Sequence, residues 1–426
     1  MKILSITAGA AGMYCGSCFR DNALAAELIA QGHDVTLVPV YTPTRTDEAN
    51  VSQRRVLFGG ISVYLQQHSA LFRRTPRLLD RLWDSPRIIS ALAGRAASTD
   101  AKLLGSLTVS MLQGNDGVLR KEFDKLVEWV RDEPRPDVIN LPNSLLIGMA
   151  RPLRDALQVP ICCTLQGEEL FLNGLVERYR TEALQLIRDQ VRHVDRFVAV
   201  SDYCAAFMGE LLAIPASKVA VVPLGIGMAG YRQRTTAREA FRVGYFARIA
   251  PEKGLHVLAE AYVRLRRMTG RLPIRLDAAG YLASDHRPYL DDVKSVLEKG
   301  GVAEEFTYHG ELDRVGKLAF LHNLDVLSVP ATYDEPKGMF VLEAMASGVP
   351  VVEPRRGAFT EIVERTGGGL LVEPDNADAL ADGLHALSSD RGHAAALGQR
   401  AYDGVRAHFT IAQSAARLAD VYRTVA

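Results

Sequence analysis

The sequence carries no excess charge of either sign, because 50 lysine and arginine residues balance 50 aspartate and glutamate residues in a chain of 426. A general electrostatic attraction to nucleic acid is therefore not expected. Long hydrophobic runs are also lacking, since none approaches the roughly 18 apolar residues that a membrane span needs. The apolar start of the chain, residues 1–8, is too short for a signal peptide and leads straight into glycines and a helical pattern. We therefore expect a cytoplasmic protein that does not bind nucleic acid.

Cysteine is scarce as well, with five residues at positions 15, 18, 162, 163 and 204. An odd number in so long a chain argues against a secreted disulfide framework. Cys15 and Cys18 form a C-x-x-C motif, which is typical of thioredoxin-like redox sites. No second pair completes four zinc ligands, so we expect no metal site. A redox role for Cys15 and Cys18 stays open, because a helix N-terminus makes a thiol more reactive.

The length of the chain exceeds that of one ordinary core and predicts two domains. Both halves alternate near-continuous apolar strand patterns with helical patterns, which indicates parallel sheets covered on both faces. The first half begins with a strand over 2–8, a glycine-rich turn and a helix over 20–31. We expect an α/β protein of two Rossmann-like, doubly wound domains. Its predicted parts are a first domain over 1–228 with an arginine-rich helical insertion at about 67–120, a linker over 229–241, a second domain over 242–405 and a C-terminal helix over 406–426 that returns to the first domain.

Two cations follow the first predicted strand of the second half. In "YFARIAPEKG", Arg248 lies just past the strand and Lys253 precedes a helical pattern. Phosphates bind where parallel strands end and helices begin, so this pair suits a phosphate or diphosphate. Exposed loop residues would show the same pattern, and the pair alone does not define a site.

A second group of candidates lies in "DEPKGMFVLEAMASGVPVV". A break in structure before the apolar helical run leaves the backbone N–H groups of Gly338, Met339 and Phe340 at a helix start. Glu335 lies in the preceding loop, and Glu343 lies about one and a half turns into the helix. A carboxylate suits the hydroxyl groups of a sugar or a ribose, because each oxygen accepts hydrogen bonds. The alternatives are a helix N-terminal acid for Glu335 and a partly buried, capped glutamate for Glu343, whose charge needs a partner in apolar surroundings.

The spacing of Glu335 and Glu343, the stretch "EPKGMFVLEAMASGVPVV" and the upstream Arg248 and Lys253 resemble the C-terminal domain of retaining glycosyltransferases of the GT-B fold, specifically glycosyltransferase family 4. The stretch "CGSCFRDNALAAELIAQGHDV" is similar to the first loop and helix of that family, with Gly16 on its second glycine. The resemblance implies metal-independent transfer of a sugar from a nucleoside-diphosphate sugar, with UDP or GDP as the nucleotide, in a cleft between the domains.

The resemblance also implies roles for individual residues. Arg248 and Lys253 would stabilise the leaving diphosphate, and Glu335 would complete the catalytic set by holding the donor sugar. Glu343 would take the ribose hydroxyls. The nucleotide sugar is a co-substrate, so no cofactor is expected. The nucleotide-sugar site would comprise Gly16, Gln166, Arg248, Lys253, Lys337, Gly338, Met339, Phe340 and Glu343.

Two positions depart from the family pattern. Gln166 stands where many members carry a histidine and cannot be protonated. Lys337 brings a cation to a commonly small or aromatic position. The acceptor, a sugar, a lipid or a small molecule, is not defined, and the arginines of 67–120 would permit contact with the inner face of a membrane. The alternative functions are epimerisation or hydrolysis of a sugar nucleotide, and sugar-nucleotide binding by an inactive partner subunit.

Overall fold

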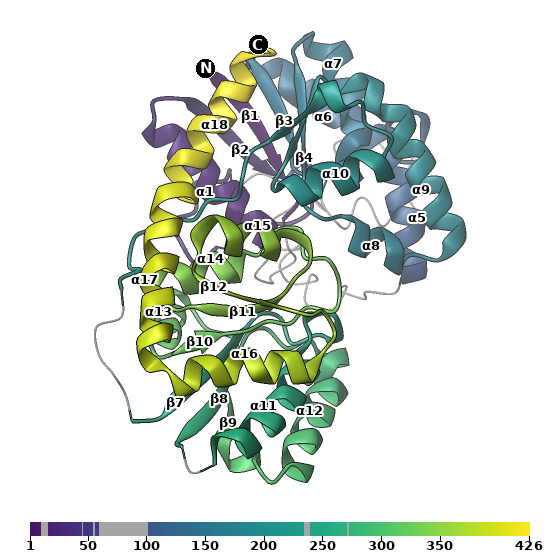
Figure 1. Cartoon of the computed structure of the whole chain (residues 1–426). Helices are drawn as coiled ribbons and strands as arrows, with labels where there is room; N and C mark the ends of the chain where they lie inside the picture. The colour runs from purple at the N-terminus through teal and green to yellow at the C-terminus, as the bar shows by residue number, and fades with distance from the viewer. Residues whose placement is uncertain (10–15, 45, 54–55, 59–100, 234–238, 271) are drawn as a thin grey trace. The chain divides into compact units, whose positions relative to one another are not determined.

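The computed structural model describes residues 1–9, 16–44, 46–53, 56–58, 101–233, 239–270 and 272–426 (Figure 1). The contacts divide the chain into two compact units. Unit 1 comprises Met1–Pro223 and Ser414–Ala426, and unit 2 comprises Leu224–Gln413. Each unit contains a six-stranded parallel sheet with helices packed on it, so the expected α/β architecture of two Rossmann-like domains is confirmed.

The sheet of unit 1 has the strand order β2-β1-β3-β4-β5-β6. The order reverses between β1 and β3, which pair with each other in parallel. The strands are β1 (Lys2–Thr7), β2 (Asp34–Pro39), β3 (Val138–Leu141), β4 (Ile161–Leu165), β5 (Arg196–Ala199) and β6 (Val219–Val221).

The helices of unit 1 include two that sequence reasoning placed with different bounds. The first helix begins at Gly16, four residues before the predicted start, and ends at Ala30. Of the predicted insertion, residues 67–100 lie outside the described part, and a helix begins at Ala101. The helices are α1 (Gly16–Ala30), α5 (Ala101–Leu112), α6 (Arg120–Asp132), α7 (Ala150–Leu157), α8 (Glu169–Gly174), α9 (Glu177–Gln190), α10 (Asp202–Leu211) and α18 (Ile411–Arg423), whose residues from Ser414 onward belong to unit 1.

The sheet of unit 2 has the order β12-β11-β10-β7-β8-β9, which is that of a dinucleotide-binding fold with its reversal between β7 and β10. The strands are β7 (Phe241–Phe246), β8 (Ile274–Ala279), β9 (Phe306–Tyr308), β10 (Val326–Leu327), β11 (Val351–Pro354) and β12 (Gly369–Val372). The helices are α11 (Leu255–Thr269), α12 (Arg287–Lys299), α13 (Arg314–His322), α14 (Met339–Ala346), α15 (Gly357–Thr366), α16 (Ala377–Ser389) and α17 (Arg391–His408), and a short 3-10 turn, η5 (Pro251–Lys253), precedes α11.

The boundary between the units lies at Pro223 and Leu224, a few residues before the expected one. Leu224 and Ile226 are buried in the core of unit 2, and Ile226 pairs with Thr410 in an isolated parallel bridge. Of the predicted linker over 229–241, residues 234–238 lie outside the described part. Tyr231 is buried in unit 2, so the first part of that segment packs as part of the second unit.

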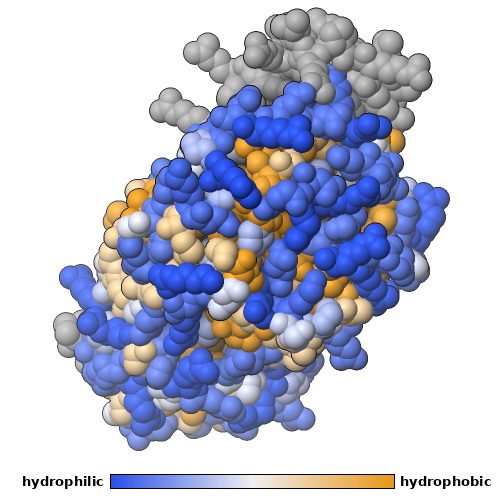
Figure 2. All heavy atoms as spheres, turned by 90° about the horizontal axis from the view of Figure 1, so that it is seen from above, coloured by the Kyte–Doolittle hydropathy of each residue, from blue (hydrophilic) through white to orange (hydrophobic). Residues whose placement is uncertain are grey.

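The described surface is mainly polar. Figure 2 shows hydrophilic residues over most of one face, with hydrophobic residues gathered in smaller areas between them. Among the residues that the structure describes, none of the helices has the length and hydropathy that a bilayer crossing requires.

Candidate functional site

The candidate site of unit 2 is built on the loops that follow β7 and β10, the two strands at which the sheet order reverses. Ligands of doubly wound folds bind outside the carboxyl ends of such strands. The loop after β7 carries Arg248 and leads into η5, which ends with Lys253. The loop after β10 carries Tyr333 and Glu335 and leads into α14.

Lys253 and Glu335 form a buried ion pair that joins these two loops. The Lys253 Nζ lies 2.5 Å from the Glu335 Oε2 and donates a second hydrogen bond of 2.7 Å to the Tyr333 hydroxyl. That hydroxyl in turn donates to the Glu335 Oε2. The ammonium also lies over the rings of Tyr333 and Phe340, at 4.9 and 5.4 Å from their centroids. One of its three N–H groups has no hydrogen bond within the described part of the chain, which leaves a donor for an anionic ligand.

The other oxygen of Glu335 accepts from the start of α14. The backbone N–H groups of Lys337 and Gly338 donate to Oε1 at 3.2 and 3.4 Å. Burial alone would raise the pKa of Glu335, but the charges of Lys253 and Lys337 and the hydrogen bonds from Lys253 and Tyr333 lower it to about 2. Glu335 therefore stays ionised near neutral pH and acts as a hydrogen-bond acceptor, not as an acid.

Gly338 terminates the loop and begins α14. Its φ of 66° is in the left-handed region, and a Cβ there would lie 2.7 Å from the Ile362 Cδ1. The expectation that the Gly338 N–H is open at the helix start is wrong, because that group donates to Glu335. The N–H groups of Met339 and Phe340 have no hydrogen bond among the described residues and remain the available donors of this helix start.

Glu343 lies on α14 in a separate polar cluster. Its Oε1 accepts from the Lys317 Nζ at 2.8 Å and from the Tyr231 hydroxyl at 3.0 Å. Arg314 lies over the Tyr231 ring at 4.8 Å. Its partners neutralise the charge on Glu343 without using Oε2, which has no hydrogen bond within the part of the chain that the structure describes.

Arg248 is more exposed than Lys253 and lies outside the buried cluster. Its Nη2 donates to the Glu252 Oε1 at 2.9 Å, and its side chain is 47% exposed. Tyr245 fixes the backbone there, because its hydroxyl donates to the Arg248 carbonyl. An ion pair this exposed is weak and exchanges its partner readily, so Arg248 can turn to an incoming phosphate.

A second buried carboxyl group, on Glu353 of β11, lies close enough to Lys253 and Glu335 for their charges to act on it. The Val329 N–H donates to both of its oxygens, at 3.1 and 3.2 Å. Burial raises the pKa of Glu353 well above its ordinary value, and although the bond from Val329 and the charge of Lys253 act in the other direction, Glu335 raises it further. Burial therefore disfavours the charged form of Glu353.

The expected site residues of unit 1 are Gly16 and Gln166. Gly16 is the first residue of α1. Gln166 follows β4, is 4% exposed and donates to the Pro142 carbonyl at 2.7 Å. Glu168 joins the loop after β3 to the loop after β4, since its oxygens accept from the backbone N–H groups of Ser144 and Gln166. The Gln166 Oε1 is buried and has no partner among the described residues, so it is open to a hydroxyl donor.

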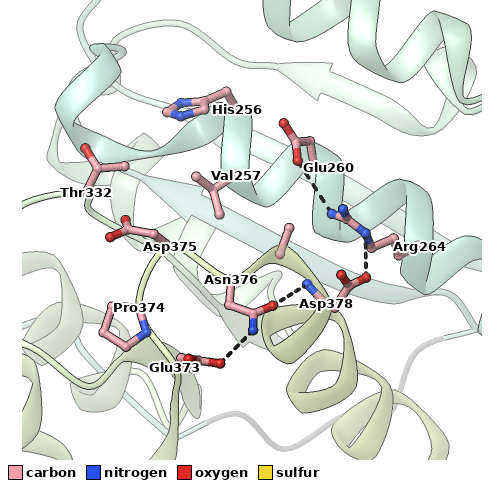
Figure 3. A pocket seen from close by; sticks show the side chains of 11 residues that line it. His256, Val257, Glu260, Arg264, Thr332, Glu373, Pro374, Asp375, Asn376 and Asp378 are labelled. Carbon is pink, nitrogen blue, oxygen red and sulfur yellow. Dashed lines mark hydrogen bonds and ion pairs between the residues drawn. The ribbon is translucent and has the colours of Figure 1, made fainter.

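A cavity of about 530 Å³ in unit 2 adjoins the loop after β10 (Figure 3). It is lined by residues of α11, by Thr332 of that loop and by the segment from β12 into α16. Several of its polar side chains contact one another: Arg264 contacts both Glu260 and Asp378, and Asn376 donates to Glu373. We do not assign it to the site, since the phosphate-binding candidates do not line it.

Sequence reasoning missed several residues of these clusters. Tyr333 stood beside Glu335 without being singled out, although a hydroxyl two residues before a carboxylate is a visible signal. Lys317 and Tyr231 could be found only from the fold, because they lie on α13 and in the expected linker.

Both halves of the chain match families of glycosyltransferases. The family described as "Glycosyl transferases group 1" matches residues 231–404, and the "Glycosyl transferase 4-like domain" matches residues 22–225. The GDP-mannose-dependent alpha-(1-6)-phosphatidylinositol monomannoside mannosyltransferase of Mycobacterium tuberculosis is 30% identical over 49% of this chain. The chain spans 57% of the length of that relative. The lipopolysaccharide core biosynthesis mannosyltransferase LpsB of Rhizobium meliloti is 29% identical over 70% of this chain and 82% of its own length.

Solved structures share the fold at low identity. Sucrose-phosphate synthase from Thermosynechococcus elongatus superposes with a TM-score of 0.71 at 18% identity, covering 99% of this chain and 98% of that one. Anabaena HepE, solved in complex with UDP and glucose, gives a TM-score of 0.69 at 17% identity over the full length of both chains. The fold is therefore that of the GT-B glycosyltransferases. The chain belongs to glycosyltransferase family 4, the group 1 glycosyltransferases.

Proposed function

We propose that this protein is a retaining glycosyltransferase that takes its sugar from a nucleoside-diphosphate sugar. The observation that carries the proposal is the buried Lys253–Glu335 pair at the topological reversal of unit 2, in a chain of this family. It joins a cation suited to a diphosphate with a carboxylate suited to sugar hydroxyls.

The chemical step places new negative charge on the departing diphosphate. Lys253 keeps one N–H group available for this charge, and Arg248 turns from Glu252 to add a second cation. Fixed donors directed at developing charge make large contributions to catalysis. Glu335 is already ionised, so it accepts from the sugar without moving a proton, and a sugar hydroxyl takes the place of one of the long backbone contacts, from Lys337 or Gly338, at Oε1. Glu343 offers Oε2 to the ribose hydroxyls.

The donor is a UDP- or GDP-sugar in this proposal. The relatives include a GDP-mannose-dependent mannosyltransferase, and HepE is a fold neighbour solved with UDP-glucose. Their names do not agree on one nucleotide, and both therefore enter the test. The relatives' acceptors are a phosphatidylinositol mannoside and lipopolysaccharide, which supports a sugar-bearing lipid or a sugar as the acceptor class.

Thermal unfolding with UDP, GDP, ADP and dTDP tests the donor site. A nucleotide at about 100 times its dissociation constant stabilises by about 2.7 kcal/mol, which is a measurable shift in Tm. We expect one nucleotide to raise the Tm of the wild type. In Lys253→Met, the apparent affinity for that nucleotide should be at least tenfold lower. Lys294→Met, which removes an exposed lysine of α12, serves as the matched control. No shift with any nucleotide would refute the proposal.

Product analysis with the matching nucleotide sugar then separates transfer from the alternatives. Release of free sugar or of an epimer at turnover rates, without an acceptor, would identify a hydrolase or epimerase instead. Transfer with retained anomeric configuration, read by NMR of the product, is the expected result.

A further inference from the structure

One face of the unit 1 sheet is polar at the carboxyl ends of its central strands. The register pairs Ser5 with Asn140 and Asn140 with Cys162, so these side chains share a face. Further along the same face, the Thr164 hydroxyl donates to the Asn140 Oδ1 at 3.2 Å. The opposite face is apolar and contributes Ile6, Leu141, Cys163 and other residues to the core. A polar layer at this edge needs a polar occupant or internal partners.

Arg20 of α1 is linked to the end of β1 through its neighbour Asp21. The Arg20 Nη1 lies 3.3 Å from the Asp21 Oδ1. The Asp21 Oδ2 accepts at 2.9 Å from the hydroxyl of Thr7, the last residue of β1. Both Arg20 and Asp21 contribute to the electrostatic environment of buried Tyr422, which places them near α18, the helix drawn beside α1 in Figure 1.

The remaining edge of the Arg20 guanidinium is buried and without a partner. Arg20 is 3% exposed, and its Nε and Nη2 have no hydrogen-bond partner among the described residues. A buried donor that lacks a partner destabilises the fold. Nε–H and Nη2–H point in parallel along one side of the guanidinium, which is the geometry that binds both oxygens of a carboxylate or phosphate. The molecule therefore keeps an anion-binding edge that its own side chains leave open.

We infer that unit 1 binds an acceptor substrate carrying a phosphate or carboxylate group, and that this group docks on the Nε/Nη2 edge of Arg20. The inference rests on the proposed function. Arg248 and Lys253 of unit 2 are the cations proposed for the donor diphosphate, and the expected donor contacts in unit 1, Gly16 and Gln166, carry no charge, so the Arg20 edge is left for a group of the other substrate. Gln166, the expected contact of the donor sugar, directly follows β4 in the same unit, and its buried Oε1 has no partner among the described residues. The start of α1 adds its N-terminal dipole, with no acidic residue in the first turn to oppose it.

Binding of three sugar probes to the full chain tests this inference. Glucose, glucose 6-phosphate and glucuronate are titrated in the presence of the nucleotide that saturates the donor site. We expect glucose 6-phosphate or glucuronate to bind the wild type at least tenfold more tightly than glucose, and the better anion to identify the group. Arg20→Gln should remove the preference, and Arg20→Lys should reduce it several-fold, because an ammonium retains the charge but not the paired donors.

Arg151→Gln is the matched control, since Arg151 is an exposed arginine of the same unit that pairs with Asp116. Circular dichroism shows whether each variant folds, and the comparison of probes on the wild type needs no variant. Equal binding of glucose and both anions to the wild type would overturn the inference, as would an unchanged preference in folded Arg20→Gln. Weaker nucleotide binding in Arg20→Gln would assign the anion to the donor and also overturn it. Nucleotide binding that persists while the anion preference is absent refutes this inference and leaves the donor site standing.

Discussion

Glu335 shows how a carboxylate can be buried at a site without becoming neutral. Four donors from two loops and a helix start surround it: the Lys253 ammonium, the Tyr333 hydroxyl and the N–H groups of Lys337 and Gly338. A buried charge is stable only when it is paired and hydrogen-bonded, and here both conditions hold. The same four donors fix the carboxylate in one orientation, which is what the recognition of a particular set of sugar hydroxyls requires.

The depressed pKa of Glu335 predicts a specific dependence of stability on pH. The folded pKa of about 2 lies below the ordinary value of 4.5, so ionised Glu335 stabilises the fold above about pH 4.5 and this stabilisation is lost as the pH falls towards 2. The loss amounts to about 3 kcal/mol. Glu335→Gln should therefore be less stable than the wild type at pH 7, with a difference that shrinks below pH 4.

Urea unfolding of both proteins at pH 7, 5, 4 and 3 measures this difference. Glu364→Gln, at an exposed carboxylate of α15, is the control and should stay within about 0.5 kcal/mol of the wild type throughout. A constant difference between wild type and Glu335→Gln across the pH range would show that Glu335 is not perturbed.

The Lys317–Glu343 pair carries the second prediction at this scale. Both side chains are largely buried, and Lys317→Met would leave the Glu343 charge with only the Tyr231 hydroxyl. Removal of one partner of a buried pair costs about 3–5 kcal/mol. We expect Lys317→Met to be destabilised by that amount and the double variant Lys317→Met with Glu343→Leu to recover much of the stability while losing nucleotide affinity. Denaturant unfolding and nucleotide titration check the two parts, and equal stability of the single and double variants would contradict the pairing.

At the scale of elements, a glycine fixes the turn that presents Lys253. Gly254 joins η5 to α11 with a φ of 75°, and a Cβ there would lie 1.9 Å from the Pro330 carbonyl oxygen. Because Pro330 begins the loop that carries Tyr333 and Glu335, any shift that relieves this contact separates the two loops. Gly254→Ala should lower both the stability and the nucleotide affinity.

Gly270 provides the control for this effect at the other end of α11. It also has a positive φ, 57°, but a Cβ added there would have no atom within 4 Å of it. Gly270→Ala should cost only the strain of a sparsely populated backbone conformation, φ 57° and ψ −114°, about 1–3 kcal/mol, with unchanged nucleotide affinity. Equal loss of affinity in the two variants would mean that the close approach to Pro330 does not position the loops.

The elements also show where sequence reasoning succeeds and where it stops. The strand over 241–249 and the helix start after Gly338 could be predicted, because apolar periodicity and a glycine are local signals. The contacts of Glu343 could not, since its partners come from α13 and from a segment expected to be a linker. The hydrogen bond of the Gly338 N–H could not be predicted either, because only the folded loop brings Glu335 close enough to accept from it.

At the scale of the whole molecule, the chain passes between the units twice, at Pro223–Leu224 and at Gln413–Ser414. The crossings are held together in each unit: the Ser414 hydroxyl donates to the Pro223 carbonyl, and Ile226 exchanges backbone hydrogen bonds with Phe409 and Ile411. The expectation that the C-terminal helix returns to the first domain agrees with this division. The amphipathic pattern of this helix predicts that it packs on a domain. Only the fold shows that the domain is unit 1.

The returning helix should matter for the stability of unit 1 alone. Tyr422 of α18 is 1% exposed, and truncation of a buried aromatic side chain costs about 3–5 kcal/mol. Tyr422→Ala should therefore lower the melting transition of unit 1, whereas Arg423→Ala, at the exposed neighbour, should change it little. A saturating nucleotide, for which we propose a site in unit 2, should raise the melting transition of unit 2. Tyr422→Ala should leave that transition unchanged. Calorimetry with and without nucleotide resolves the two transitions, and a single transition that responds to both changes would mean that the units unfold as one cooperative body.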